Sequence, residues 1–148
     1  MRSFIDTNVL VYADSADAGD KQSRASALIA QCLRDGDGVI STQVLHEFVN
    51  AAIRKLALPL DLVRMRVRLY SRFETVNASP AAVLDALDLH ALHKVPIWDA
   101  LILQAARQSG CVQLLTEELQ PGAVIGGVRI VNPFDAASPT KTRRAKTR

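Results

Sequence analysis

Short apolar runs alternate along the chain with longer segments in which apolar residues recur every three or four positions. The longer segments have the spacing of amphipathic helices. They are residues 21–33, 42–56, 60–73, a segment that starts at Ser79-Pro80, and residues 98–108. The short runs, which we expect to be strands, are residues 3–5, 39–40, 75–77, 112–116 and 128–131.

This alternation of strands and helices is typical of a parallel sheet, because parallel strands are joined by helical crossovers. We therefore expect an α/β protein with three layers, α/β/α, around a central five-stranded parallel sheet. Two local details complete the expectation. Asn8 would cap the short apolar stretch after the first strand, and Leu84, Leu87 and Ala91 point one way along their helix.

The chain has 148 residues, of which 49% are hydrophobic and 22% are charged, as in an ordinary folded domain. We expect residues 1–135 to form this domain and residues 136–148 to form a disordered basic tail. The formal net charge of +3 depends on five cations in that tail: Lys141, Arg143, Arg144, Lys146 and Arg148. Without them, 13 Lys and Arg residues face 15 Asp and Glu residues, so the remainder has a net charge of −2. The tail either binds a polyanion through its cations or is a solvated terminus.

No apolar run approaches the roughly 20 residues that a membrane span needs, and no signal-peptide pattern is present. Cys32 and Cys111 are too few and too far apart for a disulfide framework or a metal knuckle. We therefore expect a cytoplasmic protein with two buried thiols and no membrane association.

Four acidic positions are candidates for chemistry: Asp6, Glu47, Asp99 and the pair Glu117-Glu118. Each has an ordinary explanation when taken alone. An aspartate after a strand forms turns or caps, an aspartate in the first turn of a helix interacts well with its dipole, and Glu47 lies opposite the apolar face of its helix. Glu117 and Glu118 would then be loop acids.

Taken together, these acids predict a metal site. In a parallel α/β sheet, sites lie beyond the carboxyl ends of the strands, where Asp6 and the Glu117-Glu118 pair are expected. Crowded carboxylates repel one another unless cations neutralise them. Mg²⁺ and Mn²⁺ prefer oxygen ligands and bind phosphate at the same time, so such a site suits hydrolysis of a phosphodiester.

The acidic motifs resemble, in order and spacing, those of the PIN-domain nucleases, and in particular the VapC-type toxins of toxin–antitoxin pairs. The residues that carry the resemblance are 5–10 (IDTNVL), Glu47, 98–100 (WDA) and 115–119 (LTEEL), and the likeness extends to about Phe134. It implies a PIN-like sheet flanked by helices and an endoribonuclease that depends on Mg²⁺ or Mn²⁺. It also implies an RNA substrate, a homodimer and a cognate antitoxin protein.

The same resemblance implies roles for individual residues. Asp6, Glu47 and Asp99 would be the core acids of the metal site and would be catalytic. Glu118 would be the fourth acid, in a place where the family usually has an aspartate, and the sequence alone leaves Glu117 as an alternative. The residues that would orient the acids or a metal-bound water are Thr7, Asn8 and Thr116.

Basic residues outside the acidic motifs are candidates for binding RNA. Arg64, Arg68 and Arg72 recur every four residues and form one stripe, which either is a solvated face or contacts RNA or an antitoxin. Lys141, Arg143 and Arg144 in the tail are further RNA-binding candidates.

Two alternatives to a nuclease remain open at this stage. One is a catalytically inactive module that keeps the fold and binds RNA or protein. The other is a phospho-acceptor domain, which needs an aspartate after its third strand and a lysine after its fifth. Asn77 and Pro133 follow those strands here, so the sequence disfavours this second alternative.

Overall fold

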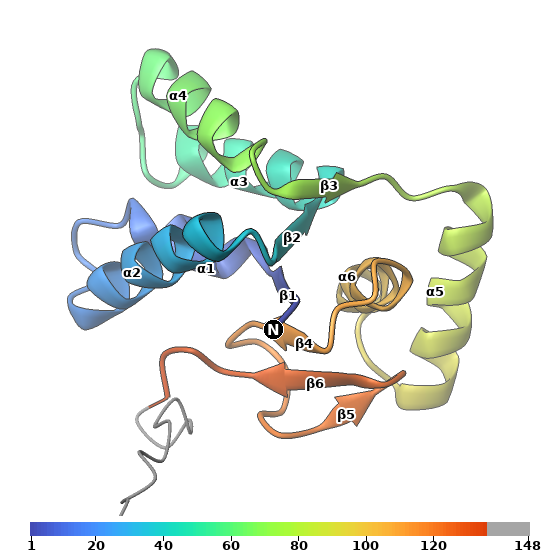
Figure 1. Cartoon of the computed structure of the whole chain (residues 1–148). Coiled ribbons are helices and arrows are strands. Elements are labelled where there is room, and N and C mark those ends of the chain that lie inside the picture. The colour runs from blue at the N-terminus through green and yellow to red at the C-terminus, as the bar shows by residue number, and fades with distance from the viewer. Residues whose placement is uncertain (136–148) are drawn as a thin grey trace, which may run out of the picture.

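Six strands form one twisted sheet at the centre of the computed structural model, which describes residues 1–135 (Figure 1). The strands are β1 (Ser3–Ile5), β2 (Gly38–Ser41), β3 (Glu74–Val76), β4 (Gln113–Leu115), β5 (Val124–Ile125) and β6 (Val128–Val131). Their order is β3-β2-β1-β4-β6-β5. Every neighbouring pair is parallel except β5 and β6, which are antiparallel. The predicted five parallel strands are confirmed, and β5 is an additional edge strand that the sequence pattern did not indicate.

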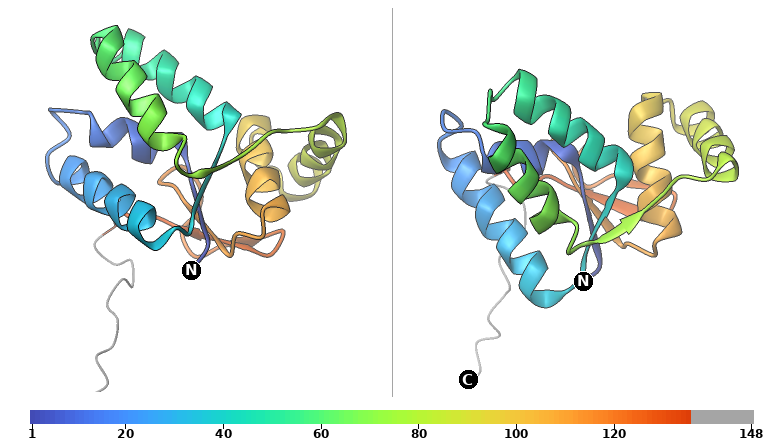
Figure 2. Two further views of the ribbon diagram at one scale, coloured as in Figure 1. Left: turned by 45° about the horizontal axis from the view of Figure 1, so that its top comes forward. Right: turned by 90° about the horizontal axis from the view of Figure 1, so that it is seen from above.

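Six helices flank the sheet on its two faces, as the three-layer prediction requires (Figures 1 and 2). They are α1 (Thr7–Ala13), α2 (Asp20–Asp35), α3 (Thr42–Arg54), α4 (Leu60–Tyr70), α5 (Pro80–His93) and α6 (Ile97–Gln108). The views place α1 to α4 on one face and α5 and α6 on the other. Among residues 1–135, no helix is long and apolar enough to cross a membrane.

The direction of chain progression through the sheet reverses between β1 and β4. From β1 the chain moves outward through β2 to β3, and it then returns to the other side of β1 to form β4 and β6. Since parallel crossovers are right-handed, this reversal explains why the first four helices and the last two cover opposite faces. In α/β sheets the crevice that binds ligands lies at such a reversal, outside the carboxyl ends of the strands, which here are β1 and β4.

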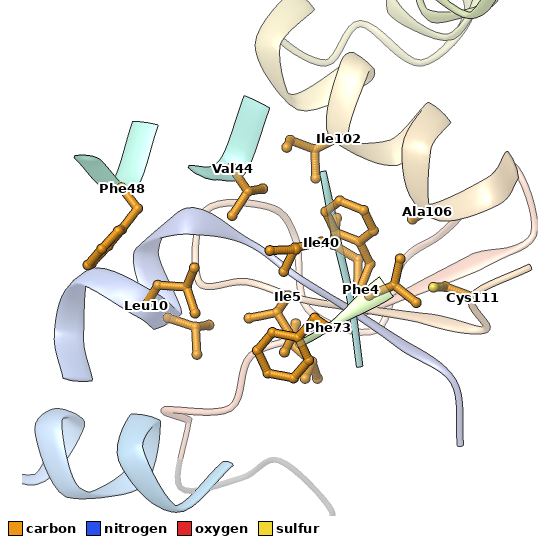
Figure 3. Close-up of a cluster of buried hydrophobic side chains, with 14 of the residues drawn as sticks. Phe4, Ile5, Leu10, Ile40, Val44, Phe48, Phe73, Ile102, Ala106 and Cys111 are labelled. Carbon is orange, nitrogen blue, oxygen red and sulfur yellow. The ribbon is translucent and has the colours of Figure 1, made fainter. Parts of the chain in front are cut away.

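The central strands are buried on both faces by the flanking helices. Phe4 and Ile5 of β1 and Val39 and Ile40 of β2 have no exposed surface. Side chains that point to opposite faces of a strand are therefore both apolar, as expected for a parallel sheet between helices. Figure 3 shows Phe4, Ile5 and Ile40 among side chains from α1, α3 and α6.

Helix α1 begins one residue after β1, and its cap differs from the prediction. The N-cap is Asp6, whose carboxylate accepts a hydrogen bond from the Thr7 amide at 2.7 Å. Asn8, the expected cap, already lies in the first turn, because the strand passes into the helix without a loop. At the other end of α1, Asp14 forms a two-pronged ion pair with Arg66, which fixes α4 against α1.

Helix α5 has apolar residues on both of its sides. Ala82, Ala86 and Leu89 are buried. Leu84 and Leu87, which point the opposite way, are exposed. The helix therefore leaves the side formed by Leu84, Leu87 and Ala91 free of contact with the core. A helix that is apolar all round gives no periodic signal of which side packs inward.

At Gly38, β2 packs closely against the segment that leads into β3. A Cβ atom on Gly38 would lie 2.6 Å from Cε1 of Phe73 and 3.1 Å from Cβ of Cys32. We expect Gly38→Ala to lower the free energy of unfolding by about 1–3 kcal/mol, the usual cost of overpacking. Chemical denaturation measures this change. In a Phe73→Leu background the penalty should shrink, and an unchanged penalty there would show that the ring is not the obstacle.

Candidate metal centre and active site

Asp6 lies at the carboxyl end of β1 and is almost completely buried, with 5% of its surface exposed. Its Oδ1 atom accepts the Thr7 amide, while Oδ2 accepts hydrogen bonds from the Thr116 hydroxyl at 2.8 Å and the Asn8 amide at 3.2 Å. Asp6 thus caps a helix and also has an oriented carboxylate at the crevice between β1 and β4. The capping role of Asp6 is therefore confirmed, and its role in a metal site stays a prediction.

Thr116, at the end of β4, connects the two strand ends. Its buried hydroxyl donates to Asp6 and accepts hydrogen bonds from the Asn8 side chain at 3.0 Å and the Glu118 amide at 3.1 Å. One side chain therefore fixes the Asp6 carboxylate and the backbone that carries Glu118.

Three carboxylates converge in this crevice: Asp6, Asp99 and Glu118. One oxygen of each lies within 4.8 Å of the other two, a separation that one cation can bridge. Asp99 comes from the first turn of α6, which begins after Pro96. Segments from residues 6, 99 and 118 thus meet at one point, as the sequence analysis predicted.

Glu47 lies beside this triad without being part of it. Its carboxylate accepts hydrogen bonds from the Thr7 hydroxyl at 2.9 Å and from the Gln43 side chain at 2.7 Å. Gln43 also donates to the Trp98 carbonyl at 3.3 Å and so joins α3 to the start of α6. Gln43 lies one helical turn before Glu47, but the sequence pattern does not reveal its contact with α6.

The structure separates Glu117 from Glu118. Glu117 turns away and binds the Tyr12 hydroxyl and Lys21, whose Nζ lies 2.9 Å from Oε2. Glu118 turns toward Asp6 and Asp99. The acid nearest the triad centre from this pair is therefore Glu118, although the sequence left both possible.

Burial and mutual repulsion raise the pKa values of all three triad acids. The pKa of Asp6 rises to about 7, mainly because burial penalises the charged form; hydrogen bonds from Thr116 and Thr7 oppose this, while the charges of Glu118 and Glu47 add to it. Burial and the charge of Glu47 raise the pKa of Asp99. Burial, then the charges of Asp99, Glu47 and Glu117, raise the pKa of Glu118, whose carboxyl group is hydrogen-bonded to that of Asp99.

The donor set fits a hard divalent cation. Three carboxylates offer oxygen ligands, and a doubly charged ion relieves the repulsion that raises their pKa values. The Oδ1 atom of Asn8 is buried beside Asp6 and has no hydrogen-bond donor among the described residues. It can accept a hydrogen bond from water carried by such an ion. Among residues 1–135, no other group of acids, histidines and cysteines has this geometry, so His90 and His93 do not form a metal site.

Comparison with known proteins identifies the family. Residues 3–119 match the sequence profile of the PIN domain. The chain belongs to the PIN-domain family. No curated protein sequence matches it significantly.

Solved structures that are similar to this chain include a VapC toxin and toxin–antitoxin complexes. The toxin VapC20 of Mycobacterium tuberculosis, described as cleaving the sarcin-ricin loop, superimposes with a TM-score of 0.65 at 16% identity, over 78% of this chain and 91% of that one. A toxin–antitoxin complex from Klebsiella pneumoniae superimposes with a TM-score of 0.63 at 24% identity, over 90% of this chain and 98% of that one. DNA-bound VapBC from Salmonella typhimurium superimposes with a TM-score of 0.63 at 21% identity, over 88% of this chain and 96% of that one.

The arginine stripe lies away from the PIN-domain triad. Arg64 and Arg68 line a groove between α3 and α4, and none of the residues that line this groove belongs to the triad. Arg72 is exposed just beyond α4. Lys141, Arg143 and Arg144 lie outside the described residues.

The raised pKa of Asp6 predicts how stability depends on pH without metal. Between its ordinary pKa of 3.8 and about 7, the folded protein keeps a proton on Asp6 that the unfolded chain has released. The free energy of unfolding should therefore fall as the pH rises through this interval and level off above it. Urea denaturation in EDTA at a series of pH values measures this fall, and Mn²⁺ should stabilise the protein most at the highest pH.

Asp6→Asn is the matched variant, because asparagine also caps helices well. It should flatten the pH dependence and remove most of the stabilisation by Mn²⁺, whereas Asp61→Asn on exposed α4 should change neither. A metal-free wild-type protein that became more stable as the pH rose from about 4 to 7 would contradict this account.

Proposed function

We propose that this protein is an endoribonuclease that uses Mg²⁺ or Mn²⁺ to hydrolyse phosphodiester bonds of RNA. The observation that carries the proposal is the convergence of Asp6, Asp99 and Glu118 within 4.8 Å in a PIN-domain chain. RNA is proposed as the substrate because VapC20, which has the same fold, is described as cleaving the sarcin-ricin loop.

Asp6, Asp99 and Glu118 would hold the cation, and Glu47 would be the fourth acid of the site. When bound, a divalent cation offsets the charge of the scissile phosphate and lowers the pKa of its water ligand. Thr116 and the Thr7 amide keep the Asp6 carboxylate oriented toward the crevice. Thr7 and Gln43 hold the Glu47 carboxylate beside the triad, and Asn8 presents its free acceptor to water.

We also propose that a cognate antitoxin neutralises this nuclease, since several structures with the same fold are toxin–antitoxin complexes. The groove between α3 and α4 is a suitable contact surface. It is lined by Val49, Ile53, Leu60, Val63, Arg64, Val67 and Arg68. Apolar side chains next to two arginines suit a partner segment that is apolar and acidic, and co-purification with a small protein from a neighbouring reading frame would supply the candidate.

The homodimer is a further part of this proposal, and the outer side of α5 supports it. Exposed fractions there are 41% for Val83, 63% for Leu84 and 46% for Leu87. A contiguous apolar helix face of this kind is typical of contacts between subunits.

Substitution of the triad tests the nuclease proposal directly. We expect Asp6→Asn, Asp99→Asn and Glu118→Gln each to lower Mn²⁺-dependent cleavage of RNA by more than about 100-fold, because even residues that only orient metal ligands contribute roughly 10- to 100-fold. Glu117→Gln is the matched control, since Glu117 faces Tyr12 and Lys21. Gel-resolved cleavage with Mn²⁺ and with EDTA measures these effects. Full activity in the triad variants, or RNA binding without any turnover by the wild type, would overturn the proposal.

The introduction of two negative charges on the apolar side of α5 tests the dimer. The double variant Leu84→Glu/Leu87→Glu should be a monomer in sedimentation equilibrium, whereas the wild type and Met65→Glu, an exposed apolar position on α4, should be dimers. A wild-type monomer, or a double variant that remains a dimer, would show that α5 is not the interface.

A further inference from the structure

Trp98 is the only tryptophan of the chain. It precedes Asp99 in the first turn of α6, and 66% of its surface is exposed. Exposed apolar residues are common on protein surfaces, so exposure alone indicates nothing. The informative point is that the only indole of the protein is exposed at the residue next to Asp99, a proposed metal ligand.

Among residues 1–135, the indole belongs neither to the hydrophobic core nor to a pair of aromatic rings. The buried positions of α6 are Ala100, Ile102, Leu103, Gln104 and Ala106, which pack toward the sheet and α5. The ring contacts in the described part of the chain link Tyr12 with Phe134, Phe48 with Tyr70, and Tyr70 with Phe73, and none includes Trp98. Removal of the indole should therefore leave the fold intact.

The backbone that carries the indole is held firmly at the site. Pro96 precedes the helix with φ −54°, and the Trp98 carbonyl accepts a hydrogen bond from Gln43, which also holds Glu47. Neighbouring residues of a helix have Cα atoms about 3.8 Å apart and side chains about 100° apart. The indole therefore starts from a fixed point one residue from the Asp99 carboxylate.

The triad by itself gives RNA little affinity. The charged groups that shift the pKa values of Asp6, Asp99 and Glu118 are all acids. Lys21, which lies near Glu117, is occupied by its ion pair and by the rings of Tyr12 and Phe134. A contact with an uncharged part of the nucleotide avoids this acidic field, and the faces of the bases are such a part.

We propose that Trp98 stacks on the base of an unpaired nucleotide next to the scissile phosphate and so positions RNA over the acid triad; this inference rests on the proposed ribonuclease function. Stacking on an indole needs a base that has left its helix, so the preferred substrate is single-stranded or looped RNA. Purines, with their larger ring faces, bind more tightly than pyrimidines at this position.

Because the chain has one tryptophan, its fluorescence reports on this contact alone. Mixing with excess single-stranded RNA in a stopped-flow instrument, in Mg²⁺ and before cleavage proceeds, should quench the emission, while the same sequence as a blunt duplex should not. Trp98→Ala should weaken binding of labelled single-stranded RNA, measured by anisotropy, by about 10-fold or more, and Trp98→Phe by clearly less. Met65→Ala removes an equally exposed apolar side chain from α4 and should leave the affinity unchanged.

Cleavage measured in the same samples separates this inference from the proposed function. Cleavage without quenching, or an unchanged affinity of Trp98→Ala, would overturn the stacking proposal and leave the nuclease proposal intact. Quenching by RNA that is never cleaved would support stacking and overturn the nuclease proposal. The absence of both binding and cleavage would overturn the two together.

Discussion

The hydrogen bond from the Thr116 hydroxyl to the Asp6 carboxylate joins the ends of the parallel strands β1 and β4. Chain progression through the sheet reverses between these two strands. The same hydroxyl accepts a hydrogen bond from the Glu118 amide, so the positions of two triad acids depend on one buried side chain. Asp99 reaches this point from α6, on the face of the sheet opposite α1 (Figure 1). The geometry of the site is therefore determined by strand pairing, by helix packing and by the turn after β4 that carries Glu118.

This arrangement favours cation binding at the expense of metal-free stability. Burial of Asp6 and the proximity of Glu47 and Glu118 raise its pKa to about 7, so the protein without metal holds a carboxyl group that resists ionisation. A divalent ion reverses this balance, because the charged form then gains more from the ion than it loses by burial. Functional sites commonly concentrate such unfavourable interactions, which the surrounding core must offset.

The surfaces outside the crevice divide into regions with different composition. The outer side of α5 is apolar, the groove between α3 and α4 combines apolar residues with Arg64 and Arg68, and the first turn of α6 exposes the Trp98 indole. These three regions lie on different elements, so a dimer, a protein inhibitor and an RNA segment can each use a separate part of the molecule.

The sequence by itself determined the parallel sheet, its five parallel strands and the acids at the strand ends. These features follow from local properties: hydrophobic period identifies strands and helices, and the carboxyl ends of parallel strands share one edge. Asp6, Asp99 and one acid of the Glu117-Glu118 pair could therefore be predicted as neighbours from their places along the chain and from the motifs they share with PIN domains.

Only the tertiary structure decided which partner each of the ambiguous side chains has. Glu117 binds Tyr12 and Lys21, about 100 residues earlier, and this contact leaves Glu118 as the acid that faces the triad. Thr7 and Gln43 in the same way hold Glu47 beside the triad, and α5 packs inward through Ala82, Ala86 and Leu89 while Leu84 and Leu87 stay exposed. Such choices depend on distances between elements that are remote in sequence, and a local pattern contains no information about those distances.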